Sequence, residues 1–385
     1  MTSPNPPDSL NGPVDGGVQR TAAWPLALAM VCLIVYASLY PFADWRNQGI
    51  SPFDFLKAPL PKYWSGFDVG ANLAGYAPLG FLLALSGLRS GRVTWAATVA
   101  VLSAAALSLA METLQSYLPS RVPSNVDWAL NTAGAVLGAG SAWMLERLGV
   151  LGRWSRVRAR WFSSDARGAL ALLALWPVAL LFPASIPFGL GQVLERLEQS
   201  LAETLLNTPF LEWLPLRDVE LQPLLPGMEG ICVALGALAP ILLGYCVIHT
   251  ARQRAFFGLL MLAIGVALTG LSAALTYGPQ HAWSWLDLPV RAGLVMAAVL
   301  AFGMLPLRRS GAAAFALLVL GLHLALLNQA PASAYFAQTL QIWEQGRFIR
   351  FHGVVQWLGW VWPYAVLAYL LTRLTWRDAA RPTHR

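Results

Sequence analysis

The chain has 385 residues, of which 57% are hydrophobic and only 12% are charged, whereas a soluble domain carries about 45–50% apolar and about 25% charged residues. This composition excludes an ordinary soluble domain and predicts a polytopic membrane protein. The formal net charge of +7 could suggest a nucleic-acid partner, but the basic residues cluster between apolar segments, as the positive-inside rule describes. We therefore expect membrane lipids, and no nucleic acid, as partners.

A helix needs about 20 mainly apolar residues to cross a bilayer. The segments that meet this criterion predict an all-α protein with about ten transmembrane helices. Residues 1–22, rich in Pro, Gly, Asn and Ser, are expected to form a disordered cytoplasmic tail before them. The predicted spans are residues 23–41, 68–88, 93–113, 126–145, 168–185, 228–249, 255–277, 289–307, 311–328 and 354–372.

The connecting loops alternate in charge. If the N-terminus is cytoplasmic, arginines gather in the loops on the cytoplasmic side, which agrees with the positive-inside rule. Both termini are therefore expected in the cytoplasm. The arginines of this side are Arg20, Arg89, Arg92, Arg147, Arg153, Arg156, Arg158, Arg160, Arg167, Arg252, Arg254, Arg308, Arg309, Arg373, Arg377, Arg381 and Arg385.

Three parts follow from the spans and the loop charges. Residues 23–146 form a four-helix membrane domain, residues 147–167 a basic cytoplasmic linker, and residues 168–385 a second membrane domain of about six helices. In the outer segment 186–226, leucines line one face of an amphipathic helix and glutamates line another. Such a helix lies on the membrane surface or covers the bundle, and its acidity favours packing on the protein itself.

Polar residues recur at the outer ends of spans two to four, three or four positions apart, so they share one helix face. An ionisable residue inside a span is by default a functional hypothesis. These residues are therefore the candidate site, facing away from the cytoplasm. They are Asp68, Asn72 and Tyr76 on span two, Glu112 and Gln115 on span three, Arg121 in the turn, and Asp127 and Asn131 on span four.

Structural roles compete with this interpretation. Asp68 and Asp127 each lie in the first turn of a predicted helix, where capping alone would explain a carboxylate. Glu112 lies at the unfavourable end of the helix dipole and needs a partner, for which Arg121 is the candidate. A polar clamp that merely joins three helices would explain the whole set equally well.

Two further patterns bear on packing and on a second site. Gly134 and Gly138 form a GxxxG pattern on span four, and Gly75, Ala77 and Gly80 keep span two slim, which favours close helix contact. Near the last span, the secondary candidates Arg347, Arg350 and His352 could hold an anionic group. Anchoring at the membrane interface explains these three residues, and the nearby tryptophans, equally well.

Catalytic and cofactor motifs give no signal. The three cysteines, Cys32, Cys232 and Cys246, lie in apolar segments without CxxC or Cys/His spacing, so neither a disulfide framework nor a zinc site is indicated. The chain has no P-loop, GxSxG or HExxH motif and no metal-spaced carboxylates. We expect no metal and no cofactor.

Three motifs in order, DxxxNxxGYxPLG (68–80), ExxQxxLPxR (112–121) and DxxxNxxGAxxG (127–138), resemble the VanZ-like family of bacterial membrane proteins. The resemblance covers roughly residues 23–146 and includes SLYPF (38–42) at the end of span one. It implies a multi-pass protein of the bacterial cytoplasmic membrane. The family is named for an accessory protein linked to resistance to the glycopeptide teicoplanin, and its members also occur near exopolysaccharide genes. Val122, Pro123 and Ser124 depart from the aromatic or acidic residue that often follows the arginine.

Three hypotheses follow. The first is that the polar residues bind an extracytoplasmic lipid-linked glycan, phospholipid or cell-wall precursor. The second is a metal-independent transferase or hydrolase in which Glu112 and Asp127 serve as acid and base. The third is a scaffold subunit of a polysaccharide synthesis or export machine.

Overall fold

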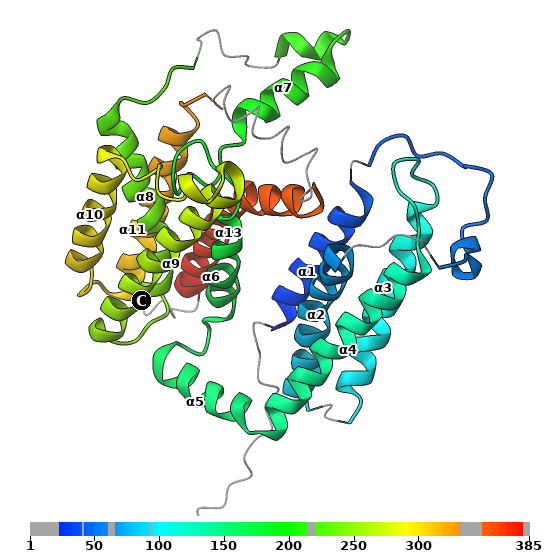
Figure 1. Cartoon of the computed structure of the whole chain (residues 1–385). Coiled ribbons are helices and arrows are strands. Elements are labelled where there is room, and N and C mark those ends of the chain that lie inside the picture. The colour runs from blue at the N-terminus through cyan, green and yellow to red at the C-terminus, as the bar shows by residue number, and fades with distance from the viewer. Residues whose placement is uncertain are drawn as a thin grey trace, which may run out of the picture.

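The computed structural model describes residues 23–40, 42–60, 66–91, 94–213, 221–331 and 349–379. Within these ranges, the side chains of residues 67, 68, 199, 212, 349–354 and 374–379 are not described. The predicted cytoplasmic tail lies outside the described residues. Figure 1 shows the arrangement of the helices, with one group of helices formed by the first part of the chain and another by the second.

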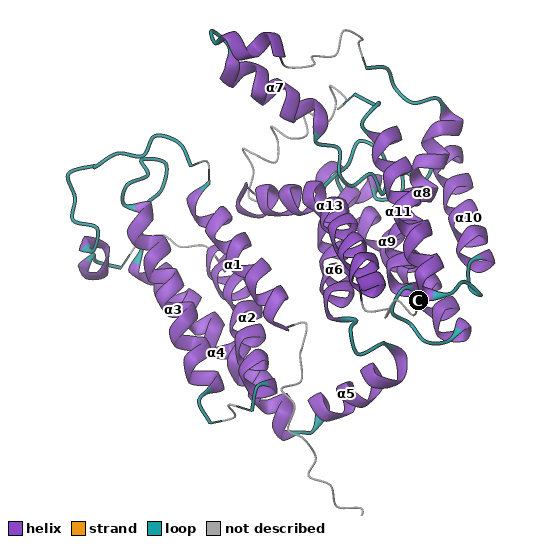
Figure 2. Ribbon diagram, turned by 180° about the vertical axis from the view of Figure 1, so that it is seen from behind, coloured by secondary structure: helices purple, strands orange, loops and turns teal. Residues whose placement is uncertain are grey.

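The described residues form helices and no strand, as the sequence predicted (Figure 2). The long helices are α1 (Ala23–Leu39), α2 (Gly66–Arg89), α3 (Ala96–Gln115), α4 (Asn125–Arg147), α5 (Val150–Trp161), α6 (Arg167–Ala179), α7 (Leu194–Leu205), α8 (Pro226–Tyr245), α9 (Ala251–Tyr277), α10 (Leu288–Gly303), α11 (Arg309–Leu327) and α13 (Ile349–Ala379). Short 3-10 turns are η1 (Asp54–Lys57), η2 (Pro209–Trp213) and η3 (Pro279–His281).

Each of the ten predicted spans coincides with one of these helices. Among the described residues, α2, α3, α8, α9 and α11 are long and apolar enough to cross a membrane, and α1, α6 and α10 are apolar but shorter. The protein is thus a polytopic helical membrane protein. The predicted basic linker 147–167 is not an open loop, because most of it forms helix α5.

Helices α2 and α4 make the most extensive contact in the first group. Glycines allow it: a Cβ at Gly80 would overlap the backbone of Ala135, and one at Gly138 would overlap the carbonyl of Ala77. Gly134 likewise lies against the backbone of Leu73. The expected close contact is confirmed at Gly80, Gly134 and Gly138 but not at Gly75, where a Cβ would meet nothing within 4 Å. It fixes the relative height of the polar residues on the two helices.

In the second group α8 is the central helix, and most of its residues are buried. The predicted span 168–185 extends too far, because α6 ends at Ala179. Pro183 and Pro187 follow closely, and each lacks the N–H group that would continue the helix. The chain then turns back, so that the buried Phe188 packs beside Trp176.

The two groups meet through α1. Tyr36 and Leu33 of α1 pack against Phe182 and Val355 of the second group, and the rings of Tyr36 and Trp357 have centroids 6.1 Å apart. This interface is apolar. It joins the predicted first domain to the helices that bound the second.

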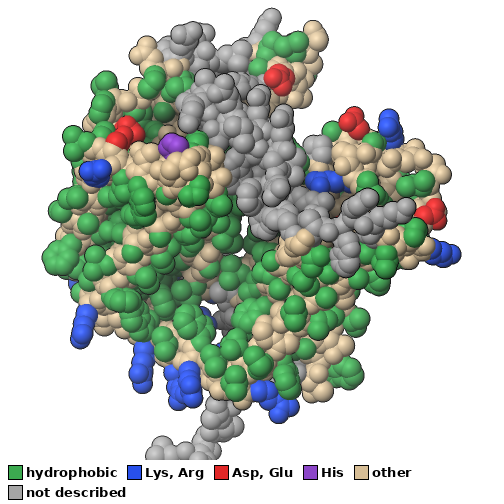
Figure 3. All heavy atoms as spheres, viewed as in Figure 1, with side chains coloured by type: hydrophobic (Ala, Val, Ile, Leu, Met, Phe, Trp, Pro, Cys, Tyr) green, Lys and Arg blue, Asp and Glu red, His purple; other side chains and the backbone are tan. Residues whose placement is uncertain are grey.

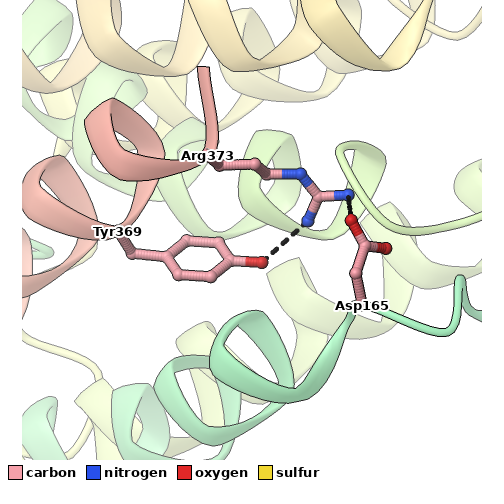
Figure 4. Close-up of polar contacts among 3 residues, drawn as sticks. All are labelled: Asp165, Tyr369 and Arg373. Atoms are coloured by element: carbon pink, nitrogen blue, oxygen red, sulfur yellow. Dashed lines mark hydrogen bonds and ion pairs between the residues drawn. The ribbon is translucent and has the colours of Figure 1, made fainter. Parts of the chain in front are cut away.

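An ion pair closes the second group at the predicted cytoplasmic side (Figure 4). Arg373 Nη2 of α13 lies 2.8 Å from Asp165 Oδ2, just before α6, and Arg373 Nη1 donates to the hydroxyl of Tyr369 at 2.7 Å. The sequence placed Asp165 and Arg373 on the same side of the membrane. Their contact agrees with that placement.

Helix α7 departs from expectation. Leu194, Leu197 and Leu201 on its apolar face stay 38%, 50% and 39% exposed, so the expected packing of this face on the protein is not seen among the described residues. Leu190, which the predicted outer segment 186–226 includes, lies before the first residue of the helix, Leu194, and belongs to the buried core.

Candidate functional site

The first turn of α4 is capped by the hydroxyl group of a serine, and the carboxylate of Asp127 bonds to another helix. Ser124 is the N-cap residue, and its Oγ accepts a hydrogen bond from the Asp127 backbone N–H at 3.3 Å. The Asp127 side chain instead accepts from Asn72 Nδ2 of α2, with Oδ1 at 2.8 Å. Helix capping was the competing explanation for Asp127 in the sequence, whereas the N-cap residue is Ser124.

Glu112 is buried in the last turn of α3 and is only 3% exposed. Its Oε2 accepts a hydrogen bond from the Ser124 backbone N–H at 2.9 Å. The expected need for a partner is thus met in part by the start of α4, since a buried carboxylate requires hydrogen-bond donors. The ion pair between Glu112 and Arg121 stays a prediction.

Deeper in the bundle, two buried side chains join α3 to α4. Asn131 Nδ2 donates to Ser108 Oγ at 3.0 Å, and these residues are 6% and 0% exposed. Tyr76 of α2, 5% exposed, lies close to Ser108 and Glu112. The Tyr76 hydroxyl and Asn131 Oδ1 have no hydrogen-bond partner among the described residues.

Gln115 and Arg121 turn toward α1. Arg121 donates from Nε and Nη2 to Tyr40 O at 3.1 and 2.7 Å and from Nη2 to Ala37 O at 3.1 Å, and Gln115 Nε2 donates to Ser38 O at 3.1 Å. The last carbonyls of a helix lack intrahelical donors and carry partial negative charge. These two side chains therefore hold the end of α1 against the turn between α3 and α4.

The structure therefore divides the predicted set. We call the residues that connect α2, α3 and α4 the outer polar cluster; they are Asn72, Tyr76, Ser108, Glu112, Asp127 and Asn131. Gln115 and Arg121 form the α1 clasp beside it. Sequence reasoning missed Ser108 and Ser124, although Ser108 lies four residues before Glu112 on the same helix face and Ser124 has the N-cap spacing to Asp127.

The remaining candidates are not placed. The Asp68 side chain is not described, although its backbone lies in α2 one turn before Asn72. Arg347 lies outside the described residues, and the side chains of Arg350 and His352 at the start of α13 are not described. Of the tryptophans assigned to the membrane interface, Trp362 is buried and donates to Leu172 O at 2.7 Å, so it belongs to the core.

The cluster combines groups of different chemistry in an apolar setting. Leu79, Met111 and Leu118 are buried around it, which strengthens electrostatic interactions inside it. Glu112 is enclosed, while Asn72 and Asp127 are only partly buried and form its outer edge. Such an arrangement can accept hydrogen bonds from hydroxyl, amide or ammonium groups, and it can hold two carboxyl groups in unequal surroundings.

Comparison with known proteins identifies one segment. The model of the VanZ/LLP1 family matches residues 23–146, which are helices α1 to α4 and contain both the outer polar cluster and the α1 clasp. The second group of helices lies outside this match. No curated protein matches the chain, and no solved structure matches it.

Proposed function

We propose that the VanZ-like domain, residues 23–146 of this membrane protein, binds the polar group of an extracytoplasmic amphiphile at the outer polar cluster. Lipid-linked glycans, phospholipids and cell-wall precursors have the required chemistry, because each joins an apolar tail to a polar group at the membrane surface. One observation carries the proposal. Two buried atoms, the Tyr76 hydroxyl close to Ser108 and Glu112 and the Oδ1 of Asn131, make no hydrogen bond of normal geometry among the described residues.

Such groups are costly when they stay unpaired. A buried polar atom without a partner destabilises the fold by about 1–3 kcal/mol, so a cluster that served only to join helices would be expected to satisfy both. A ligand hydroxyl can donate to Asn131 Oδ1, and a ligand oxygen can accept from Tyr76. The partly buried Asn72 and Asp127 lie where such a group would enter.

The test uses ligand retention and fold stability together. Tyr76→Phe removes the unpaired hydroxyl and nothing else, so the ligand-free variant should be at least as stable as the native protein. If Tyr76 holds a ligand, the envelope lipid or glycan that co-purifies with the full chain should fall severalfold by mass spectrometry. Thr132→Ala is the matched control, because the Thr132 hydroxyl bonds to Trp128 O of its own helix. Unchanged retention in folded Tyr76→Phe protein would refute the site.

A second candidate, transfer or hydrolysis on the same amphiphile, is favoured by the unequal surroundings of the two carboxyl groups. Glu112 is 3% exposed, whereas Asp127 is partly buried and bonded to Asn72. One could donate a proton to a leaving oxygen while the other takes a proton from the attacking hydroxyl. Labelled lipid-linked oligosaccharide separates the two functions: Glu112→Gln should abolish turnover while binding persists. If the native protein does not turn over this substrate, the enzymatic function is refuted and the binding function remains.

The physiological setting is proposed from the family match. We place the protein in the bacterial cytoplasmic membrane, with its cluster on the outer side, where glycopeptide resistance or exopolysaccharide production would be affected. Loss of the gene should then alter teicoplanin susceptibility or exopolysaccharide yield, and Tyr76→Phe should reproduce the change. If a polysaccharide synthesis complex co-purifies and the cluster variants keep full function, the protein acts as a scaffold instead.

A further inference from the structure

Helix α5 presents three distinct faces. Leu151, Ser155 and Arg158 point inward and are buried or partly buried. The second face is an exposed apolar stripe of Val150, Trp154 and Val157, and the third is an exposed basic stripe of Arg153, Arg156 and Arg160. Because each set is spaced by three or four residues, the two exposed stripes run side by side along the helix.

Both ends of α5 are attached to the rest of the protein. At its start, Arg89 of α2 donates from Nη2 to Leu151 O at 2.6 Å. At its end, the His249 N–H donates to Trp161 O at 3.1 Å, and the Ser163 N–H donates to Val247 O at 2.8 Å. The helix is therefore a fixed strut between the VanZ-like domain and the second group, and its exposed stripes keep one orientation.

The position of α5 places it beside a membrane surface. It connects α4 and α6, two helices that coincide with predicted spans, and Figures 1 and 2 show it at one end of both groups of helices. On the face drawn in Figure 3, Lys and Arg side chains line that end without Asp or Glu, whereas the other end carries side chains of both signs. This is the end that the positive-inside rule assigns to the cytoplasm.

The charge around α5 is uncompensated within its own segment. Residues 148–164 contain four arginines and no acidic residue. On the inward face, burial together with repulsion from Arg167 and Arg89 lowers the pKa of Arg158. Positive charge therefore gathers on two sides of the helix, and an anionic surface would relieve it.

We propose that α5 is an interfacial helix that binds the anionic phospholipids of the cytoplasmic leaflet. The apolar stripe of Val150, Trp154 and Val157 inserts at the boundary between the lipid headgroups and the acyl chains. The arginines of the basic stripe bind lipid phosphates at the level of the headgroups, as in other amphipathic interfacial helices. A water-exposed linker would leave a contiguous Trp and Val stripe in water, which costs hydrophobic free energy. Through its fixed ends, α5 couples lipid binding to the junction of the two helix groups.

The first experiment measures lipid retention. The full chain is reconstituted in nanodiscs of phosphatidylglycerol and phosphatidylcholine, and the bound phosphatidylglycerol is counted by native mass spectrometry. The variant R153Q/R156Q/R160Q should retain at least threefold less phosphatidylglycerol than the native protein. The matched control R252Q/R308Q/R309Q removes three arginines from the same predicted side but not from α5, and it should retain the native amount. Equal losses in both variants would overturn the proposal, since net charge alone would then explain retention.

The second experiment keeps all arginines and measures depth. A fluorescent probe is attached at Val157→Cys in a Cys32→Ser background, since Cys32 is exposed and Cys232 and Cys246 are buried. Lipids brominated on their acyl chains should quench this probe, whereas a probe at the exposed Ala159→Cys, on another face, should be quenched by aqueous iodide. Iodide quenching at position 157 would overturn the proposal, and shielding from both quenchers would show a protein partner instead.

Discussion

At the scale of single residues, two charged side chains of the VanZ-like domain bond to backbone groups at the ends of other helices. Glu112 receives the Ser124 N–H, and Arg121 donates to the last carbonyls of α1. Each contact satisfies a group at a helix end that has no intrahelical partner. These two charged side chains therefore stabilise the packing of the helices. A ligand would bind to polar groups that have no such structural hydrogen bond.

Replacement of Glu112 separates its acceptor role from its charge. Glu112→Ala leaves the Ser124 N–H without this acceptor, so the free energy of unfolding should fall by about 1–3 kcal/mol. Glu112→Gln keeps an acceptor oxygen and should lose less. Thermal unfolding of detergent-purified protein measures the difference. If both variants unfold at the same temperature, the hydrogen bond contributes little.

Arg254 offers a second test in the other group of helices. It is 5% exposed, and its guanidinium donates to Tyr245 O at 2.9 Å and to Leu305 O at 3.0 Å. Arg254→Ala would leave these carbonyls unpaired and should destabilise the protein by at least about 2 kcal/mol. The exposed neighbour Arg252 is the control, and Arg252→Ala should change the melting temperature little. An equal change in melting temperature for the two variants would contradict a stabilising role for the buried Arg254 hydrogen bonds.

At the scale of elements, the contact between α2 and α4 sets the geometry of the site. Its glycines bring the two backbones together, and this brings Asn72 within hydrogen-bond distance of Asp127. In membranes, helices associate mainly through such close packing because lipid tails are as apolar as the side chains. The motif glycines and the motif polar residues are therefore parts of one arrangement.

Gly138→Ala should disrupt this arrangement. Its Cβ would overlap the carbonyl of Ala77, and overpacking of this kind costs about 1–3 kcal/mol. Gly140→Ala is the control on the same helix, where a Cβ meets nothing within 4 Å, and it should be neutral or slightly stabilising because alanine favours helix. Melting temperatures in detergent provide the comparison. A stable Gly138→Ala protein would show that the two helices can separate without cost.

At the scale of the whole molecule, two helix groups share one apolar interface at α1 and one strut, α5. The family match covers only the first group, so the second supplies something that the family pattern does not describe. Helix α5 joins it to the first group, through Arg89 at the start of α5 and through Val247 and His249 at its end, and α1 packs along it. The second group is thus positioned to support the VanZ-like domain or to respond to it.

Orientation in the membrane is the whole-molecule prediction. Ser284, between α9 and α10, should lie outside, and Ala251, before α9, should lie in the cytoplasm; both are exposed. In Cys32→Ser protein, a membrane-impermeant maleimide should label Ser284→Cys in intact cells and label Ala251→Cys only after permeabilisation. The reverse pattern would place the outer polar cluster in the cytoplasm and remove the proposed ligands.

The amino-acid sequence was enough to predict the membrane class, the approximate position of each membrane span and the residues of the VanZ-like motifs. These features are local, because apolar length, loop charge and motif spacing are read within one segment. The end of α6 was misplaced, although Pro183 and Pro187 were visible in the sequence, because apolar composition continues past them.

Which side chains meet depends on the tertiary structure. Arg121 and Gln115 bond to the end of α1, Ser108 joins Asn131, and α5 turns a basic linker into a fixed strut. These contacts join residues tens of positions apart, and most depend on how close neighbouring backbones come. That distance is set by packing between helices, which no single segment of sequence contains.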